Sequence, residues 1–137
     1  MKISTKGRYA LRVMAYIALN SQEDKIISIT ELAERNSISV KYLEQIISLL
    51  VKHELLLSFR GAQGGYKLAK PAKEITIGEI MNSTEGILET VSCLNGNEKC
   101  DMSETCLTVN VWAKLDKIVN DFFNSTTLED VVKKRVL

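Results

Sequence analysis

The sequence lacks any stretch long enough to cross a membrane. Its longest unbroken apolar run, Val13 to Leu19, has seven residues, against the roughly 20 that a spanning helix needs. No apolar signal region stands near its beginning. We therefore expect a cytoplasmic protein with no membrane partner. Its 137 residues, 45% of them apolar, are enough for one compact core.

Histidine and cysteine are also scarce. The single histidine is His53, and the chain has neither a paired nucleophile and base nor a phosphate-binding loop, so we do not expect an enzyme. An odd number of cysteines in a cytosolic protein argues against a disulfide framework. No two cysteines have the two-residue gap typical of zinc sites. Metal or redox chemistry therefore explains the three cysteines better than disulfides do. They are Cys93, Cys100 and Cys106.

The small net charge of +1 hides two halves of opposite sign. Residues 1–73 carry 12 basic and 6 acidic side chains, whereas residues 74–137 carry 6 basic and 11 acidic ones. A net charge of +6 on the first half makes it the candidate for contact with a polyanion such as DNA.

Helical periodicity and capping residues predict three helices in the first half. The first ends near Asn20, and the second starts at the capping-box spacing of Ser28 and Glu31 and runs to about Asn36. Ser39 can cap the third helix. One face of that helix is apolar, and the opposite face is polar. The apolar positions are Leu43, Ile46, Ile47, Leu50 and Val51.

Short strand-like runs at 55–59 and 66–69 then flank a segment with three glycines, which predicts a β-hairpin that ends at Pro71. Thr76 and Glu79 form a second capping-box pattern, opening a helix that closes by Gly86. A polar loop at 95–103 precedes a long helix from about Thr108 to Asn124. A third capping box is predicted at Thr126–Glu129. The long helix carries a broad apolar stripe of Val111, Leu115, Ile118, Val119, Phe122 and Phe123.

This order of elements predicts a mainly α fold with a small β-hairpin wing, that is, a winged helix-turn-helix plus a long C-terminal helix. We expect residues 1–73 to bind DNA, 74–106 to hold a linker helix and the cysteine loop, and 107–137 to form a dimerisation helix and tail. The alternative is a small helical protein whose third helix merely has a solvated face and whose hairpin is a connector.

The predicted third helix and the wing carry the candidate DNA-binding side chains. Glu44 and Gln45 suit the reading of cytosine and adenine, and Arg60 suits the minor groove. Other side chains are candidates for contacts with the DNA backbone or for holding the helix start. They are Lys6, Arg8, Ser39, Lys41, Tyr42 and Gln63.

Four segments resemble the Rrf2 family of regulators: residues 1–10, 42–45 and 60–66, and the run Cys106–Thr108 followed by Trp112. The resemblance extends to about Val131. It implies a winged-helix homodimer with the long helix at its interface, bound to a palindromic double-stranded operator. It also implies an iron–sulfur cluster, 2Fe-2S, on the three cysteines, with cluster status reported to cluster-assembly genes, repression being the expected outcome.

One position departs from the pattern of the iron–sulfur members of this family. Their fourth ligand is a histidine three residues after the last cysteine, where this chain has Val109. Asp101, Glu104, Asn110, a partner side chain and an exogenous thiol stay open as replacements, whereas His53 is explained as a surface residue. A metal-free regulator that responds to thiol oxidation or binds a partner enzyme, an iron–sulfur carrier, and cysteines without a function also stay open.

Overall fold

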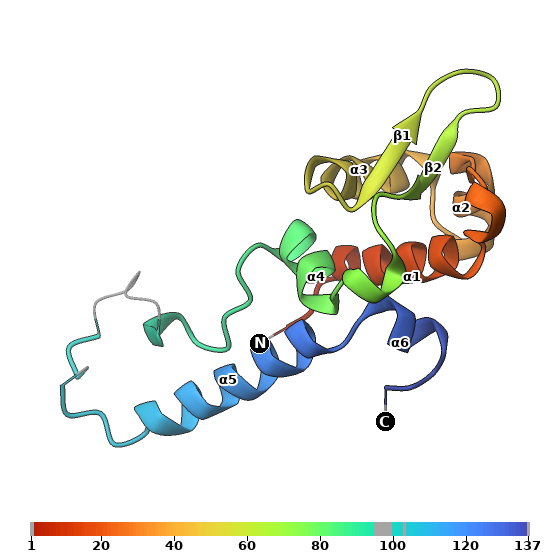
Figure 1. Cartoon of the computed structure of the whole chain (residues 1–137). Coiled ribbons are helices and arrows are strands. Elements are labelled where there is room, and N and C mark those ends of the chain that lie inside the picture. Colours follow the sequence, from red (N-terminus) through yellow and green to blue (C-terminus); the bar gives the residue numbers. More distant parts are fainter. Residues whose placement is uncertain (1, 95–99, 103, 137) are drawn as a thin grey trace.

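The computed structural model describes residues 2–94, 100–102 and 104–136. Six α-helices and one β-hairpin are the main elements of the described part, which confirms the predicted fold class of a mainly α protein with a small β-hairpin. Figure 1 shows α1 across the middle of the body, α2, α3 and the hairpin on one side of it, and α5 extending outward. The elements are α1 (Thr5–Leu19), α2 (Ile29–Asn36), α3 (Val40–Lys52), β1 (Leu56–Phe59), β2 (Gly65–Leu68), α4 (Ile77–Glu85), α5 (Val109–Ser125) and α6 (Leu128–Val132).

Polar caps fix where the helices of the first half begin. The Ser39 hydroxyl accepts a hydrogen bond from the Tyr42 N–H at 3.2 Å, and Ser28 does the same for the Glu31 N–H. The Glu31 carboxylate, however, accepts a hydrogen bond from the Tyr16 hydroxyl at 2.8 Å instead of reaching back to Ser28. Ser28 is therefore a simple N-cap, and the predicted reciprocal box does not form because a residue on α1 competes for the carboxylate.

The two later capping boxes differ in outcome. The box of Thr76 and Glu79 is confirmed, with both of its reciprocal hydrogen bonds present. The third box lies one residue further along than predicted, at Thr127 and Asp130. Thr126 instead closes α5, its N–H donating to the Phe122 carbonyl at 3.1 Å. Because α5 runs to Ser125, Thr127 is the first residue free to cap α6.

The hairpin is a two-stranded antiparallel sheet in which Leu56 pairs with Leu68 and Phe59 with Gly65. Ile27 adds a bridge to Tyr66, with hydrogen bonds of 2.9 Å in both directions. A Cβ on Gly65 would collide with the Ile27 backbone, so this close approach requires glycine. The hairpin is thereby joined to the segment that precedes α2.

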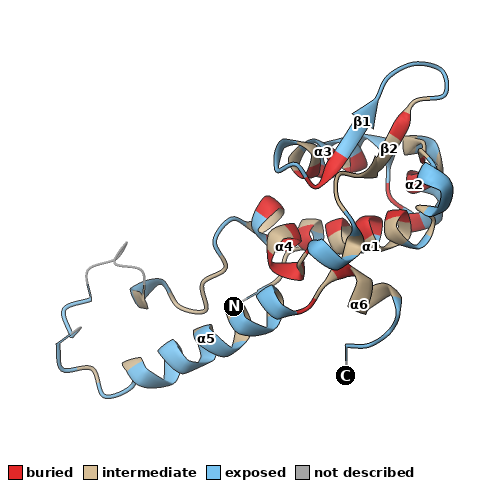
Figure 2. Ribbon diagram, viewed as in Figure 1, coloured by how far each residue is buried: buried red, intermediate tan, exposed pale blue. Residues whose placement is uncertain are grey.

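The hydrophobic core is built around α1 and includes the C-terminal α6. Figure 2 shows burial concentrated on α1, α3, α4 and the base of the hairpin, whereas α5 is largely exposed. Leu128 of α6 is fully buried, and its N–H donates to the Ile75 carbonyl at 2.8 Å. The most deeply buried large side chains are Met14, Ile17, Ile27, Leu32, Leu43, Ile46, Leu50, Leu55, Leu56, Ile75, Ile80 and Leu128.

Across the described ranges, no helix combines the length and the apolar character needed to cross a bilayer.

Candidate nucleic-acid interface and cysteine segment

The start of α3 presents a polar face to solvent. Lys41, Glu44 and Gln45 are exposed, while the next helical positions, Leu43 and Ile46, are fully buried. Burial of one side fixes the rotation of the helix about its own axis. The exposed side chains are therefore held in a defined direction and are available to an external ligand.

Tyr42 connects this helix to α1. Its ring is half-buried and meets the ring of Tyr9 edge to face, with centroids 6.0 Å apart. The Arg12 guanidinium lies over Tyr9 at 5.3 Å and donates to the Asn36 carbonyl at 2.9 Å. These contacts tie the start of α3 to α1 and to the end of α2.

The hairpin projects from the same side of α1 as α3 (Figure 1). Arg60 and Gln63 are exposed in its turn, where Gly61 has a φ of 106°. Where β1 enters the turn, Lys67 lies over the ring of the exposed Phe59 at 5.4 Å. The turn thus places the side chains of Arg60 and Gln63 outside the body of the protein, where they are accessible to a ligand.

Two further predicted DNA contacts lie in the first turns of α1. Arg8 is exposed and donates to the Thr5 hydroxyl at 3.2 Å, and Lys6 is half-buried. Ser4 caps this helix by accepting a hydrogen bond from the Gly7 N–H at 3.1 Å. Lys6 and Arg8 therefore lie at the capped start of α1, close in sequence to Tyr9 and its contact with Tyr42.

The three cysteines lie on the segment between α4 and α5. Cys93, in a short 3-10 turn at Ser92–Leu94, and Cys100 are exposed, and Cys106 is partly exposed. Within residues 2–94, 100–102 and 104–136, no three histidine, cysteine or acidic side chains lie together as a metal site. The chemistry of three thiols suits an iron–sulfur cluster, but the described residues do not bring the thiols together. Much of the predicted polar loop at 95–103 lies outside the described residues.

The surroundings of Cys106 favour its thiolate. Hydrogen bonds from the Thr108 hydroxyl, whose oxygen lies 3.4 Å from Sγ, and from the backbone N–H groups of Thr108 and Val109 lower the pKa of this thiol below its ordinary value. Thiolates are the form that binds metals and attacks disulfides. Val109 itself is the first residue of α5, and the polar side chains near it, Asn110 and Glu104, are exposed.

The beginning of the cysteine segment is docked on the middle of α5. The backbone N–H and the hydroxyl of Thr90 donate to one oxygen of Asp116, at 3.1 and 3.2 Å. Asn120 donates to the other oxygen at 3.1 Å. Figure 1 shows the stretch from α4 to the short turn at Ser92–Leu94 running beside α5. Its path is therefore coupled to the position of that helix.

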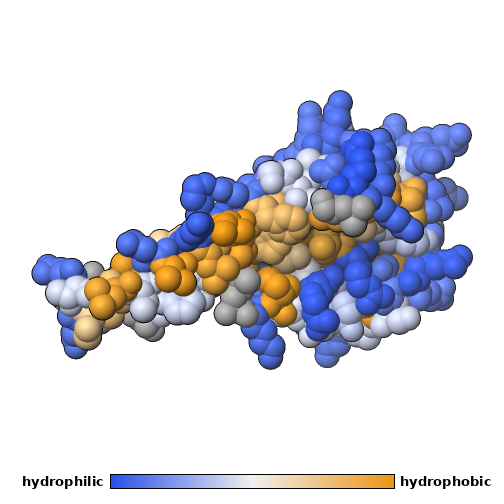
Figure 3. All heavy atoms as spheres, turned by 90° about the horizontal axis from the view of Figure 1, so that it is seen from below, coloured by the Kyte–Doolittle hydropathy of each residue, from blue (hydrophilic) through white to orange (hydrophobic). Residues whose placement is uncertain are grey.

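The outer face of α5 is apolar and uncovered. Val111, Leu115, Ile118 and Phe122 are 59%, 40%, 56% and 49% exposed. Figure 3 shows that the apolar surface continues from α5 onto the body of the protein. Since apolar faces of this length on monomers normally mark interaction sites, α5 is suited to a protein partner.

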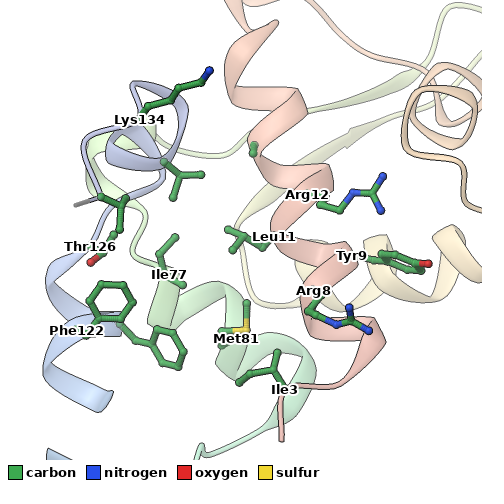
Figure 4. Close-up of a pocket in the computed structure, with 14 residues that line it drawn as sticks. Ile3, Arg8, Tyr9, Leu11, Arg12, Ile77, Met81, Phe122, Thr126 and Lys134 are labelled. Carbon is green, nitrogen blue, oxygen red and sulfur yellow. The ribbon is translucent and has the colours of Figure 1, made fainter. Parts of the chain in front are cut away.

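Where α5 meets the body, a pocket of about 780 Å³ opens between α1, α4, α5 and α6. Leu11, Met81 and Phe122 line it, and Arg8 and Arg12 are among its lining residues (Figure 4). This pocket was not predicted from the sequence. The available signal was Leu11 and Ala15, which repeat at four-residue spacing on α1 away from its main apolar stripe.

Comparison with known proteins identifies the family. The family model named Rrf2 and described as "Iron-dependent Transcriptional regulator" matches residues 3–134. This chain belongs to the Rrf2 family. The HTH-type transcriptional regulator IscR of Pectobacterium atrosepticum is 38% identical over 98% of this chain and 81% of the relative.

Solved Rrf2-family structures share the fold. CymR of B. subtilis, titled the global cysteine regulator, is 35% identical with a TM-score of 0.84, covering 98% of both chains. T. potens IscR is 36% identical with a TM-score of 0.76, covering 98% of this chain and 88% of that one. The expected family and winged-helix fold are confirmed. The chain is a transcription regulator and not an enzyme.

Proposed function

We propose that this Rrf2-family regulator acts as a homodimer that binds a palindromic DNA operator and responds through Cys93, Cys100 and Cys106. One observation carries the proposal: α3 is capped at its start and buried along one face. Its opposite face therefore directs Lys41, Glu44 and Gln45 outward beside the projecting hairpin. A helix presented in this way suits the major groove, and the hairpin suits the adjacent backbone or minor groove.

The proposed DNA contacts divide by chemistry. Glu44 and Gln45 read base edges, Gln45 at adenine and Glu44 at cytosine, because their hydrogen-bonding groups match those edges. Arg60 enters the minor groove, where Gln63 assists it. The remaining candidates set the position of the protein on the phosphate backbone: Lys6, Arg8, Ser39, Lys41 and Tyr42.

Homodimerisation through α5 accounts for its uncovered apolar face. A second copy supplies an identical apolar face, so a two-fold axis lets each copy cover the other. Two α3 helices related by that axis would enter successive major grooves about 34 Å apart, which predicts an operator of two inverted half-sites.

The proposed ligand of the cysteine segment is an iron–sulfur cluster of the 2Fe-2S type. Support comes from three thiols on one exposed segment, the description of the family as iron-dependent and the relatives named IscR. When bound, the cluster supplies sensitivity to iron and to oxidants. Cys93, Cys100 and Cys106 would hold it, with Asp101, Glu104, Asn110, a partner side chain or an exogenous thiol completing the set in place of Val109.

The contact between Thr90 and Asp116 gives this segment a route to the rest of the dimer. If the segment closes to bring the three thiols together, the strain falls on its docked end and on the start of α5. A shift of α5 changes the spacing of the two α3 helices, and with it the operator affinity. We propose that this cytoplasmic protein regulates genes of cluster assembly and that the regulation is repression.

A metal-free thiol sensor is the second candidate. The exposure of Cys93 and Cys100 leaves both thiols accessible to oxidants. The chain is also 36% identical, with a TM-score of 0.77, to a structure titled the oxidized form of S. aureus CymR, over 96% of each chain. Counting alkylated thiols before and after mild oxidation, in iron-free protein, separates this candidate from the cluster.

The test of the proposed function is a gel-shift selection from genomic fragments, with protein prepared without oxygen. The proposal expects specific fragments to be retained, with inverted half-sites, and a different affinity for the variant in which all three cysteines are alanine. If no specific fragment is retained in either state, the iron–sulfur carrier alternative is favoured instead. The division into DNA-binding residues 1–73, segment 74–106 and dimerisation residues 107–137 stays a prediction.

A further inference from the structure

The last residue of α4, Glu85, reaches the first turn of α1. Its carboxylate accepts a hydrogen bond from the Ser4 N–H at 3.0 Å and another from the Ser4 hydroxyl. Ser4 is the N-cap of α1, whose hydroxyl oxygen accepts from the Gly7 N–H. One carboxylate, 81 residues distant in sequence, therefore holds the residue with which α1 begins.

Gly7 provides independent support for this contact. It lies inside α1, where glycine is the least favourable residue apart from proline. A Cβ at this position would overlap the Glu85 carboxylate. The glycine thus makes room for Glu85 at a place where helix formation alone would prefer alanine.

Glu85 also lies between the proposed DNA-binding helices and the proposed cysteine sensor segment. Tyr9, two residues after Gly7, packs against Tyr42 at the start of α3. On the other side, Glu85 is followed directly by Gly86, which has a φ of 75°, and then by the segment that docks at Thr90 and carries the cysteines. The end of α4 is therefore the part of the core to which that segment is joined through the chain.

We infer that Glu85 is a positioning residue for DNA binding. It sets the first turn of α1, which carries Lys6 and Arg8, and transmits changes in the cysteine segment to that turn. The inference rests on the proposed function. Glu85 itself is not proposed to contact DNA, because its carboxylate is engaged by Ser4.

Four variants test the inference by operator affinity and its salt dependence. Glu85→Ala should weaken binding about tenfold and reduce the salt slope by up to about 2, since each phosphate contact of Lys6 and Arg8 contributes roughly 0.9. Glu85→Gln keeps the acceptor oxygen and should stay within about twofold of wild type. Glu89→Ala, the matched control, removes the same charge four residues further along the chain and should also stay within about twofold of wild type. Loss of a negative charge by itself would strengthen DNA binding. Weaker binding by Glu85→Ala is therefore the opposite of the change in affinity that charge alone predicts.

Gly7→Ala is the fourth variant and acts on the same contact from the other side. The added methyl group displaces the end of the Glu85 side chain, so it should weaken binding as Glu85→Ala does. In the Glu85→Ala background it should have no further effect, because the contact is already lost. Fully additive effects of the two substitutions would overturn the inference.

Amide hydrogen exchange at Ser4, Gly7 and Arg8 gives a readout without DNA, because these amides donate to Glu85 or to Ser4. We expect faster exchange in Glu85→Ala than in wild type or Glu85→Gln. Alkylation of the cysteines should change exchange in wild type and not in Glu85→Ala. Unchanged exchange in Glu85→Ala, or no response of wild type to alkylation, overturns the inference. If wild type binds no operator, the proposed function fails, while the exchange data still decide whether Glu85 links the two regions.

Discussion

Replacing Ile118 with alanine tests the outer face of α5 as the homodimer interface. Its side chain is 56% exposed in the single chain. Full burial of an isoleucine is worth about 1.5–3 kcal/mol, and a partner can cover only the exposed half. Because a two-fold axis places Ile118 in the interface twice, the dimer should lose about 1.5–3 kcal/mol, which raises its dissociation constant about 13- to 160-fold.

Sedimentation velocity over a range of protomer concentrations measures that constant. The monomer should keep its fold, because Ile118 lies outside the buried core and alanine favours helix. Lys117→Ala is the matched control on the opposite side of α5, where its ion pair with Asp121 is solvent-exposed and therefore weak. A dissociation constant for Ile118→Ala within twofold of both wild type and Lys117→Ala would refute the assignment of this face.

Three other substitutions test separate parts of the structure. Arg60→Ala should weaken specific operator binding about tenfold and lower the salt slope by about 1 in a titration at matched salt. Glu79→Gln should make the free energy of unfolding depend less on pH in acid. Burial raises the pKa of Glu79, but hydrogen bonds from Lys70 and the Thr76 N–H outweigh it and hold the pKa below its ordinary value. The stabilisation by Glu79 is thus present above the ordinary pKa of a glutamate and is lost as pH falls through the folded value, which urea unfolding at several pH values measures. Asp116→Ala should speed hydrogen exchange of the Thr90 amide about tenfold or more, because its acceptor is removed.

Each of these predictions has a result that would contradict it. Unchanged affinity and salt slope in Arg60→Ala would remove the wing arginine from the DNA interface. If the free energy of unfolding falls as steeply in acid for Glu79→Gln as for wild type, the hydrogen bonds of the Glu79 carboxylate do not contribute to stability. For Asp116, the control is Asp121→Ala on the same helix; equal exchange at Thr90 in both variants would mean that the segment is not held by Asp116.

Local chemistry was sufficient to predict where most helices begin. Ser39 and Thr76 cap helices at the expected residues, since a cap depends only on side chains within three or four positions. The third box was placed one residue early because the end of α5, and not the pattern around Thr126, decides which threonine is free. The hairpin and the apolar faces of α3 and α5 were likewise predicted from periodicity.

Contacts between distant residues could not be predicted in this way. Glu31 fits a capping box in sequence, yet its carboxylate bonds to Tyr16 on another helix. Nothing near Glu85 in the sequence indicates Ser4, and the pocket beside Leu11 needs four helices to form it. For the cysteines, spacing and family resemblance predict a cluster, which stays a prediction because the described residues do not bring the three thiols together.

Iron and acid-labile sulfide analysis of protein purified without oxygen shows whether the three cysteines hold an iron–sulfur cluster that controls operator binding. We expect about two of each per chain, their loss in the variant with Cys93, Cys100 and Cys106 replaced by alanine, and a change in operator affinity that accompanies that loss. Protein without iron or sulfide, together with a triple variant that binds and regulates as wild type does, would contradict this expectation.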